Sequence, residues 1–276
     1  MKKHLLAILI LALAAISCHR EHSSTSIVDV QNPPQDLRSL NISTFQFDTT
    51  IYGNEPEFQD FGYPSFSISV DFPDPEQAPL LANAYAEWIM ECLSFDYNDN
   101  LLDINHMIRS FFARTYKSET NEGGPFFSQT QCTIKKTFEN SQLVTFVCDG
   151  STYFIGAAHG TPYSFGATFR KGDGKIFGSN LFRTPFDNDL LIQGLKKYFN
   201  CSSDNQLLQC LVGDYDSTFE IPMPSNQPWV EADGIHYVYQ PYEIAAYSDG
   251  FPTVVIPFSQ AAPALTPLAN NLINAK

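Results

Sequence analysis

Alternating apolar and polar residues predict that much of the chain folds as half-buried strands. In one segment, Phe66, Ile68 and Val70 alternate with three serines, the period of two expected for a strand with one face in the core. Similar patterns continue toward the C-terminus and are separated by turn signals such as Asp173-Gly174. Strands are predicted over 45–52, 64–72, 130–138, 142–148, 151–155, 163–169, 219–222, 234–239 and 253–257.

Apolar residues spaced three and four apart predict three helices. These helices cover about 74–89, 101–117 and 185–199, and a short turn or helix is expected over 261–268. Because the helices stand between runs of strands and do not alternate with them, their order predicts an α+β fold. We expect a mostly antiparallel sheet or sheets with two to three packed helices, arranged as two closely associated subdomains.

The chain is long enough to bury a sizeable core. It has 276 residues, of which 43% are hydrophobic and 14% aromatic, and this composition excludes wholesale disorder. We place an N-terminal α+β subdomain at 45–160 and a C-terminal α+β subdomain at 161–276.

The first residues have the pattern of an export signal. Lys2 and Lys3 precede 12 apolar residues, a run too short to cross a bilayer, which needs about 20. The Ala-Ile-Ser-Cys sequence at 15–18 resembles a bacterial lipobox, with Ala where Leu is usual. The resemblance implies a signal peptide over 1–17 and a lipid thioether on Cys18. Ordinary secretion with a leftover cysteine is the alternative.

The segment 18–44 is polar and contains proline, a composition that predicts a flexible tether. The folded domain is therefore expected to be exported and held by its lipid at the bacterial cell envelope, facing either the periplasm or the cell surface. The lipid is the only contact with a membrane that this pattern predicts.

The chain is strongly acidic. It carries 30 Asp and Glu against 16 Lys and Arg, a net charge of -14, and loss of Lys2 and Lys3 with the signal makes this -16. Such a charge repels phosphate backbones and argues against nucleic-acid binding. The same field attracts a cationic partner.

Five cysteines follow the signal: Cys92, Cys132, Cys148, Cys201 and Cys210. An exported location permits disulfides, and an odd number leaves at least one thiol over. Cys201 and Cys210 are close enough in sequence to close a small loop, and Cys132 and Cys148 are equidistant from the predicted hairpin centre at residue 140. The alternative for either pair is two buried thiols.

The sequence lacks the common motifs of hydrolases and nucleotide-binding proteins. Two acidic stretches, 96–101 and 214–220, alternate like calcium loops but lack the turn glycine that such loops need. We interpret them as solvated surface loops, and we predict neither a metal site nor a cofactor.

Two segments contain the candidate binding residues His159, Tyr239, Tyr242 and Glu243. His159 lies among small residues at 156–160, where its ring either bonds backbone groups and holds a turn or acts as a general base; without a nucleophile motif we favour the structural role. The other three residues belong to a stretch with four tyrosines, which suits either a binding surface or strand packing.

These segments also support a family resemblance. Residues 153–160, Tyr-Phe-Ile-Gly-Ala-Ala-His-Gly, and 239–244, Tyr-Gln-Pro-Tyr-Glu-Ile, are similar to motifs of a bacterial extracytoplasmic domain family. That family occurs in the lysozyme-sensing anti-sigma factor RsiV and in the noncatalytic region of the peptidoglycan deacetylase PdaC. One departure is Ala157, which stands where a second glycine is common.

The resemblance implies a domain without catalysis that binds a lysozyme-like protein or a peptidoglycan fragment. Two alternatives belong to other classes. One is a peptidoglycan-directed hydrolase or amidase that uses His159, and the other is a purely structural envelope lipoprotein.

Overall fold

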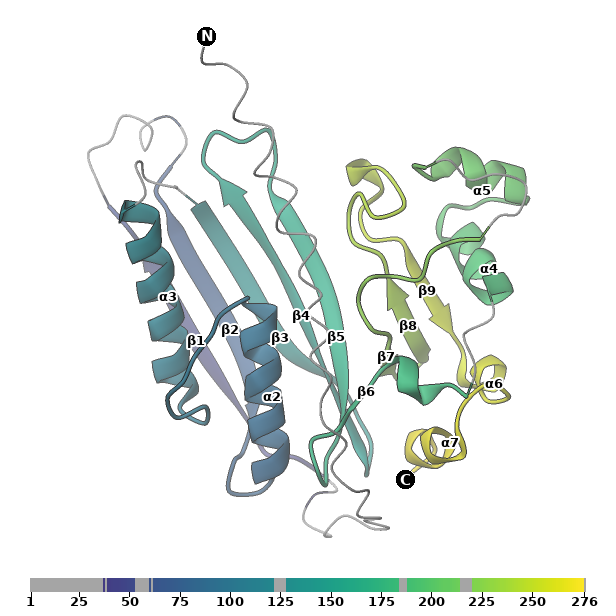
Figure 1. Cartoon of the computed structure of the whole chain (residues 1–276), viewed down its shortest axis with the longest axis horizontal. Helices are drawn as coiled ribbons and strands as arrows, with labels where there is room; N and C mark the ends of the chain where they lie inside the picture. The colour runs from purple at the N-terminus through teal and green to yellow at the C-terminus, as the bar shows by residue number, and fades with distance from the viewer. Residues whose placement is uncertain are drawn as a thin grey trace. The chain divides into compact units, whose positions relative to one another are not determined.

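The computed structural model describes residues 37, 39–52, 60, 62–121, 128–183, 188–213 and 220–275, which all belong to one compact unit. The predicted signal peptide, Cys18 and most of the predicted tether lie outside these residues. The end of the expected tether segment is folded, because Leu40 is buried and the first strand begins at Ile42. The α+β class is confirmed, and it is built on two separate sheets (Figure 1).

The larger sheet has six strands in the order β1-β2-β3-β4-β5-β6, and all neighbours are antiparallel except β2 and β3. Two helices connect the parallel pair and cover one face of this sheet (Figure 1). The elements are β1 (Ile42–Thr50), β2 (Ser65–Pro73), α2 (Pro79–Cys92), α3 (Ile104–Asn121), β3 (Ser128–Glu139), β4 (Leu143–Phe154), β5 (Thr161–Arg170) and β6 (Ile176–Phe177). The sheet therefore continues past residue 160, where we placed the boundary between subdomains.

The smaller sheet has three antiparallel strands in the order β7-β8-β9. Helix α4 packs on β9 at Gly194, where an added Cβ atom would lie 2.4 Å from a methyl carbon of Val254. The elements of this part are η2 (Ser179–Leu181), α4 (Asn188–Tyr198), α5 (Asp204–Cys210), β7 (Trp229–Glu231), β8 (Gly234–Val238), η3 (Tyr247–Asp249), β9 (Thr253–Ile256), α6 (Phe258–Ala261) and α7 (Pro267–Ile273).

Three local predictions were wrong in detail. The strands expected at 142–148 and 151–155 form the single strand β4, because Gly150 stays in the ladder and leaves room for the ring of Tyr163. Residues 220–222 are not a strand. The pattern also missed β7 and α5, which are too short for a clear period.

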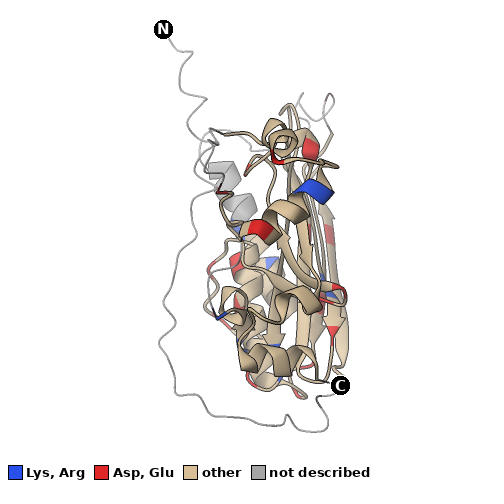
Figure 2. Cartoon of the chain, turned by 90° about the vertical axis from the view of Figure 1, so that its right-hand side faces the viewer, with Lys and Arg blue, Asp and Glu red and all other residues tan. Residues whose placement is uncertain are grey.

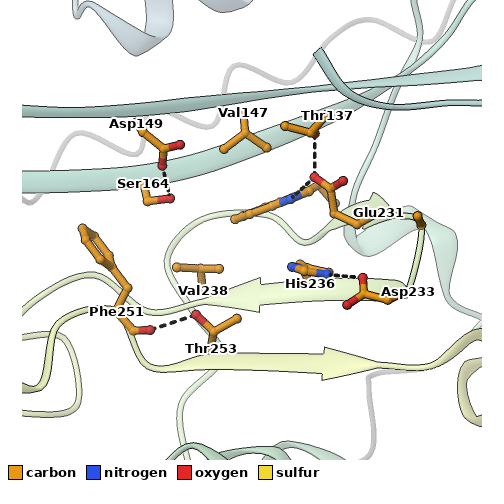
Figure 3. Close-up of a pocket in the computed structure, with 12 residues that line it drawn as sticks. Thr137, Val147, Asp149, Ser164, Glu231, Asp233, His236, Val238, Phe251 and Thr253 are labelled. Carbon is orange, nitrogen blue, oxygen red and sulfur yellow. Dashed lines mark hydrogen bonds and ion pairs between the residues drawn. The ribbon is translucent and has the colours of Figure 1, made fainter. Parts of the chain in front are cut away.

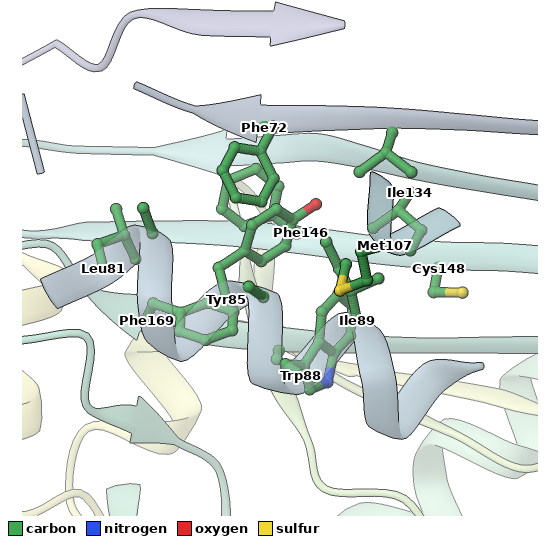
Figure 4. Packing of buried hydrophobic residues seen from close by; sticks show 14 of the residues in the cluster. Phe72, Leu81, Tyr85, Trp88, Ile89, Met107, Ile134, Phe146, Cys148 and Phe169 are labelled. Atoms are coloured by element: carbon green, nitrogen blue, oxygen red, sulfur yellow. The ribbon is translucent and has the colours of Figure 1, made fainter. Parts of the chain in front are cut away.

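The core of the larger sheet lies between its strands and helix α2. Tyr85 is fully buried there, and its ring stacks on Phe146 with ring centroids 4.0 Å apart (Figure 4). The Tyr85 hydroxyl donates to the carbonyl of Asp71 at 2.8 Å, which satisfies its polar end. The periodicity that predicted this helix therefore marks the face that fills the core.

A buried ion pair joins the end of β3 to the turn after β5. The Lys171 Nζ atom lies 2.5 Å from Glu139 Oε1, and the Lys171 side chain is 0% exposed. Glu139 also pairs with Lys136 Nζ at 2.6 Å and accepts the backbone N–H of Leu40 at 2.8 Å. Lys171 donates a further bond to the Leu37 carbonyl at 3.1 Å, so both charges are satisfied although they are largely removed from water.

Candidate functional site

His159 and Tyr242 meet at the surface, although they are 83 residues apart in sequence. His159 lies in the loop between β4 and β5, and its Nε2 atom is 3.2 Å from the Tyr242 hydroxyl. The ring of Tyr247 stacks on the imidazole with centroids 4.1 Å apart. His159, Tyr242 and Tyr247 together are called the His–Tyr cluster below.

The hydrogen bonds of the cluster define the proton positions on His159. The Nδ1 atom lies 2.8 Å from the carbonyl oxygen of Gly160, which only accepts, so Nδ1 carries the proton. In the neutral ring, Nε2 is then an acceptor, and the Tyr242 hydroxyl donates to it. His159 thus bonds its own loop through Nδ1 and Tyr242 through Nε2, and its structural role stays a prediction.

Tyr242 has an unusual backbone conformation. Its φ angle is +70°, and its side chain is 63% exposed. For a bulky residue this left-handed region costs about 1–2 kcal/mol relative to glycine. The fold thus maintains a strained turn that points an aromatic side chain into solvent.

The other two candidate residues support the Tyr242 turn from within. Tyr239 is fully buried, and its hydroxyl donates to the Pro222 carbonyl at 2.9 Å, so it is not accessible to a partner. Glu243 accepts the backbone N–H of Gln240 at 2.7 Å and that of Ser225 at 2.6 Å. Both of its carboxylate oxygens are therefore used to hold neighbouring segments.

Gln240 fastens the Tyr242 turn to the larger sheet. Its side-chain amide accepts the backbone N–H of Ser164 at 3.1 Å and donates to the Ser164 carbonyl at 2.6 Å. The Gln240 amide thus bonds the N–H and the carbonyl of one β5 residue, as a neighbouring strand would do. These two bonds explain why loops next to strands of two different sheets form one cluster.

A cleft of about 490 Å³ lies between the two sheets (Figure 3). Its wall is built on Trp229, which is only 3% exposed and lies against Gly166 of β5. A Cβ atom at Gly166 would come within 2.6 Å of the indole, so this strand position requires glycine. The lining residues are Thr137, Val147, Asp149, Ser164, Trp229, Glu231, Ala232, Asp233, His236, Val238, Phe251 and Thr253.

Two carboxylates of the cleft have shifted pKa values in opposite directions. Burial raises the pKa of Glu231, although a hydrogen bond from Thr137, the electrostatic effect of His236 and a hydrogen bond from Trp229 partly offset this effect. The hydrogen bond from His236 holds the pKa of Asp233 below its ordinary value. This cleft could not be predicted from the sequence, since its residues come from six strands, β3 to β5 of the larger sheet and β7 to β9 of the smaller one.

The cysteine pair in the larger sheet is close but offset. The hairpin turn is centred later than expected, because Glu139 pairs with Val144; Cys148 is therefore opposite Ile134 and diagonal to Cys132. The two sulfurs are 3.7 Å apart and buried as thiols. The bond to Cys148 and burial raise the pKa of Cys132 far above its usual range, which keeps the thiol protonated and unreactive.

The second pair, Cys201 and Cys210, has its sulfurs 3.8 Å apart near helix α5. These cysteines and Cys92 are also thiols in the structure. Both disulfides therefore stay predictions, although the fold brings the two sulfurs of each pair close together.

Among the described residues, no group of three or more His, Cys, Asp and Glu side chains is arranged to hold a metal ion. No helix in the described part is both long and apolar enough to cross a membrane.

Comparison with known proteins finds a family match in the C-terminal part of the chain. Residues 190–259 match a family model described as "Protein of unknown function (DUF3298)". Two solved structures are also similar. A DUF3298 family member from Bacteroides fragilis is 17% identical, with 86% of this chain and 98% of that chain covered and a TM-score of 0.59. A DUF3298 family protein from Pseudomonas aeruginosa is 16% identical, with 87% and 100% covered and a TM-score of 0.62.

The fold is that of DUF3298 family proteins. At these identities the likeness extends to the fold alone, and no curated protein matches the chain. The DUF3298 segment, residues 190–259, contains Tyr242, Trp229 and Glu231, whereas His159 lies outside it. The narrower resemblance to the RsiV and PdaC domains stays a prediction.

Proposed function

We propose that this chain is a lipid-anchored envelope protein whose DUF3298-like domain binds a cationic protein of the lysozyme class without catalysis. The observation that carries the proposal is the exposed, strained Tyr242 in the His–Tyr cluster. Exposed tyrosines on rigid turns are frequent binding hot spots, because they contribute large contact area and lose few torsions.

Further apolar residues lie beside the Tyr242 turn. Val212 is exposed, and its backbone N–H donates to the Ile244 carbonyl at 2.8 Å. Met223 is also exposed, two residues before Ser225, which is bonded to Glu243. Two segments bonded to this turn thus expose apolar side chains of their own. Exposed aromatic and apolar side chains of this kind favour a protein partner.

The surroundings of His159 support binding over hydrolysis. In the described part of the chain, its ring contacts two tyrosines and one backbone carbonyl, and no carboxylate is hydrogen-bonded to it. A general base needs a group that orients it and a nucleophile or water site within reach. Tyr242 occupies the acceptor nitrogen that such a base would use.

The charge of the protein supports a cationic partner. The net charge is -14, and acidic residues are spread over the described elements rather than gathered at one end (Figure 2). Such a field steers a basic protein toward the surface and leaves the final fit to the apolar contacts. It disfavours anionic ligands.

Titration of the purified protein with lysozyme tests the proposal. We expect association at low salt that weakens as the ionic strength rises. Tyr242→Ala is expected to lower the affinity about 30-fold, since a hot-spot side chain contributes about 2 kcal/mol or more. Isothermal calorimetry provides both values. The absence of association at low salt would contradict the proposal.

Two control variants separate binding from folding. Tyr52 is 78% exposed and follows β1, so Tyr52→Ala removes a similar side chain elsewhere and is expected to leave the affinity unchanged. Tyr242→Gly places at +70° the residue that adopts this φ freely, so it is expected to unfold at a higher temperature than Tyr242→Ala yet bind equally weakly. Soluble peptidoglycan fragments provide the comparison. Tighter binding of these fragments than of lysozyme would make peptidoglycan the ligand. Cleavage of the fragments that is lost in His159→Ala would favour a hydrolase or amidase.

The lipid anchor is tested independently at Cys18. We expect the full chain expressed in bacteria to partition into the detergent phase, and Cys18→Ala to move it to the aqueous phase, because the thioether lipid needs the thiol. A matched Cys92→Ala variant should keep the parental distribution. Detergent partitioning that persists in Cys18→Ala would exclude the anchor.

A further inference from the structure

The cleft between the two sheets has a one-sided charge. Its twelve lining residues include Asp149, Glu231 and Asp233 but neither Lys nor Arg. The carboxylates come from β4, from β7 and from the turn between β7 and β8, and they line different parts of the same open cleft (Figure 3). The side chains of Val147, Val238 and Phe251 supply apolar wall between them.

The side-chain donors at the Glu231 end are already used. The Thr137 hydroxyl donates to Glu231 Oε1 at 2.6 Å, and the Trp229 indole N–H donates to the same oxygen at 3.1 Å. Both donors therefore point at protein and not into the cleft. Glu231 Oε2 keeps its lone pairs for another donor.

The remaining side-chain donors are used in the same way. The Ser164 hydroxyl donates to Asp149 Oδ1 at 2.6 Å, and the Thr253 hydroxyl donates to the Phe251 carbonyl at 2.8 Å. His236 Nε2 lies 2.7 Å from Asp233 Oδ1, and an ionised carboxylate accepts only, so this nitrogen carries the proton. All five side chains of the lining that can donate a hydrogen bond thus donate to other groups of the protein.

The capacity that these side chains leave for a ligand consists of acceptors: carboxylate oxygens and hydroxyl lone pairs. A neutral sugar or an amide needs donors as well as acceptors from its site, and an anion needs donors alone. A guanidinium or an alkylammonium offers only donors and carries the opposite charge. Its aliphatic stem matches the apolar wall.

We propose that this cleft binds a guanidinium or alkylammonium group on an aliphatic stem, with Glu231 as its charge partner. The partial burial of Glu231, which raises its pKa, supports this assignment, because a cation in the cleft restores the stabilisation that the carboxylate loses when water is removed. The cleft does not include Tyr242, so the inference is independent of the proposed function.

The test uses two probes that differ in charge but hardly in shape, n-butylguanidinium and n-butylurea. The indole N–H resonance of Trp229 reports occupancy of the cleft, and Trp88, which is buried in the other core, serves as the internal reference. We expect saturable, millimolar binding of butylguanidinium to the full-length protein and at least tenfold weaker binding of butylurea.

Variants locate the binding. Glu231→Gln keeps an acceptor for Thr137 and Trp229, so the fold is retained, and it is expected to weaken butylguanidinium binding about tenfold. Glu76→Gln changes an exposed glutamate outside the cleft and should have no effect. Equal binding of the two probes, no saturable shift, or an unchanged affinity in Glu231→Gln would overturn the proposal.

A third probe identifies the source of the cation. A blocked Gly-Arg-Gly peptide carries the same guanidinium on a polypeptide. Tighter binding of the peptide than of butylguanidinium supports a side chain of a protein partner as the natural ligand, and weaker binding supports a free small molecule. Both results agree with the assignment of the cleft as a cation site.

Discussion

Replacement of Glu139 by alanine is expected to lower the free energy of unfolding by about 3–5 kcal/mol, because it leaves a buried ammonium without its carboxylate. The Lys171 side chain is 0% exposed and lies 2.5 Å from Glu139. The variant also loses the acceptor for the Leu40 N–H and the partner of Lys136. Urea denaturation followed by circular dichroism measures the change.

The partner variant is expected to cost less. In Lys171→Met, Glu139 keeps its ion pair with Lys136 at 2.6 Å and its bond from Leu40, so no buried charge is left uncompensated. The double variant Glu139→Leu with Lys171→Met should be more stable than Glu139→Ala alone. Equal losses for Glu139→Ala and Lys171→Met would contradict this account of the ion pair.

The Glu139 carboxylate is also expected to make the protein less stable in acid. Burial alone would raise the pKa of Glu139, but hydrogen bonds from Lys136 and Lys171 outweigh it and hold the pKa below its ordinary value of 4.5. A depressed folded pKa stabilises the protein above the unfolded pKa, and the contribution is lost as the pH falls through the folded pKa. The stability of the parent should therefore fall below about pH 4.5 more steeply than that of Glu139→Ala.

Trp229→Ala is expected to destabilise the protein by a similar amount, about 3–5 kcal/mol, since a large buried side chain is removed where the two sheets meet. Trp229 is 3% exposed and packs with Val147 and Val238. Its loss also removes the indole bond to Glu231. Chemical denaturation measures the effect, and the variant should lose the Trp229 resonance while that of Trp88 is retained.

Gly166 provides the control for this packing. Gly166→Ala alone would place a Cβ atom 2.6 Å from the Trp229 indole and is expected to cost about 1–3 kcal/mol. In the Trp229→Ala background the clash is gone, so the added cost should fall below about 0.5 kcal/mol. Additive losses in the double variant would mean that Gly166 is needed for another reason, such as the course of β5 itself.

The apolar and polar pattern of the sequence predicted those elements that are long enough to repeat the pattern several times. Helix α2 and strand β2 each repeat their pattern several times, and the face that the pattern marked is the buried one, apart from Leu80 at the start of α2, which is exposed. The short elements β7 and α5 contain too few residues for a period, and they form because neighbouring segments pack on them. Strand β7 is the element that supplies both Trp229 and Glu231 to the cleft.

The candidate site was predicted in part. Residue chemistry singled out His159 and Tyr242, and the fold brings them within hydrogen-bonding distance. It also suggested Tyr239 and Glu243, which serve as internal supports because one is buried and the other is saturated by backbone N–H groups. Tyr239 is thus buried and Tyr242 is exposed, although they are only three residues apart. The backbone turn at Tyr242, with its φ of +70°, lies between the two environments.

The sequence by itself determined the α+β class, the acidity of the protein and the residue types available for binding, since these depend on composition and local period. The tertiary structure decided which of those residues are exposed, which donors are already used, and that Lys171 and Trp229 are buried. Such properties arise from contacts between residues far apart in the sequence, such as Val230 with Thr168, 62 residues apart, and Lys171 with Leu37, 134 residues apart. Local patterns contain no information on those distances, because the pairing of the strands sets them.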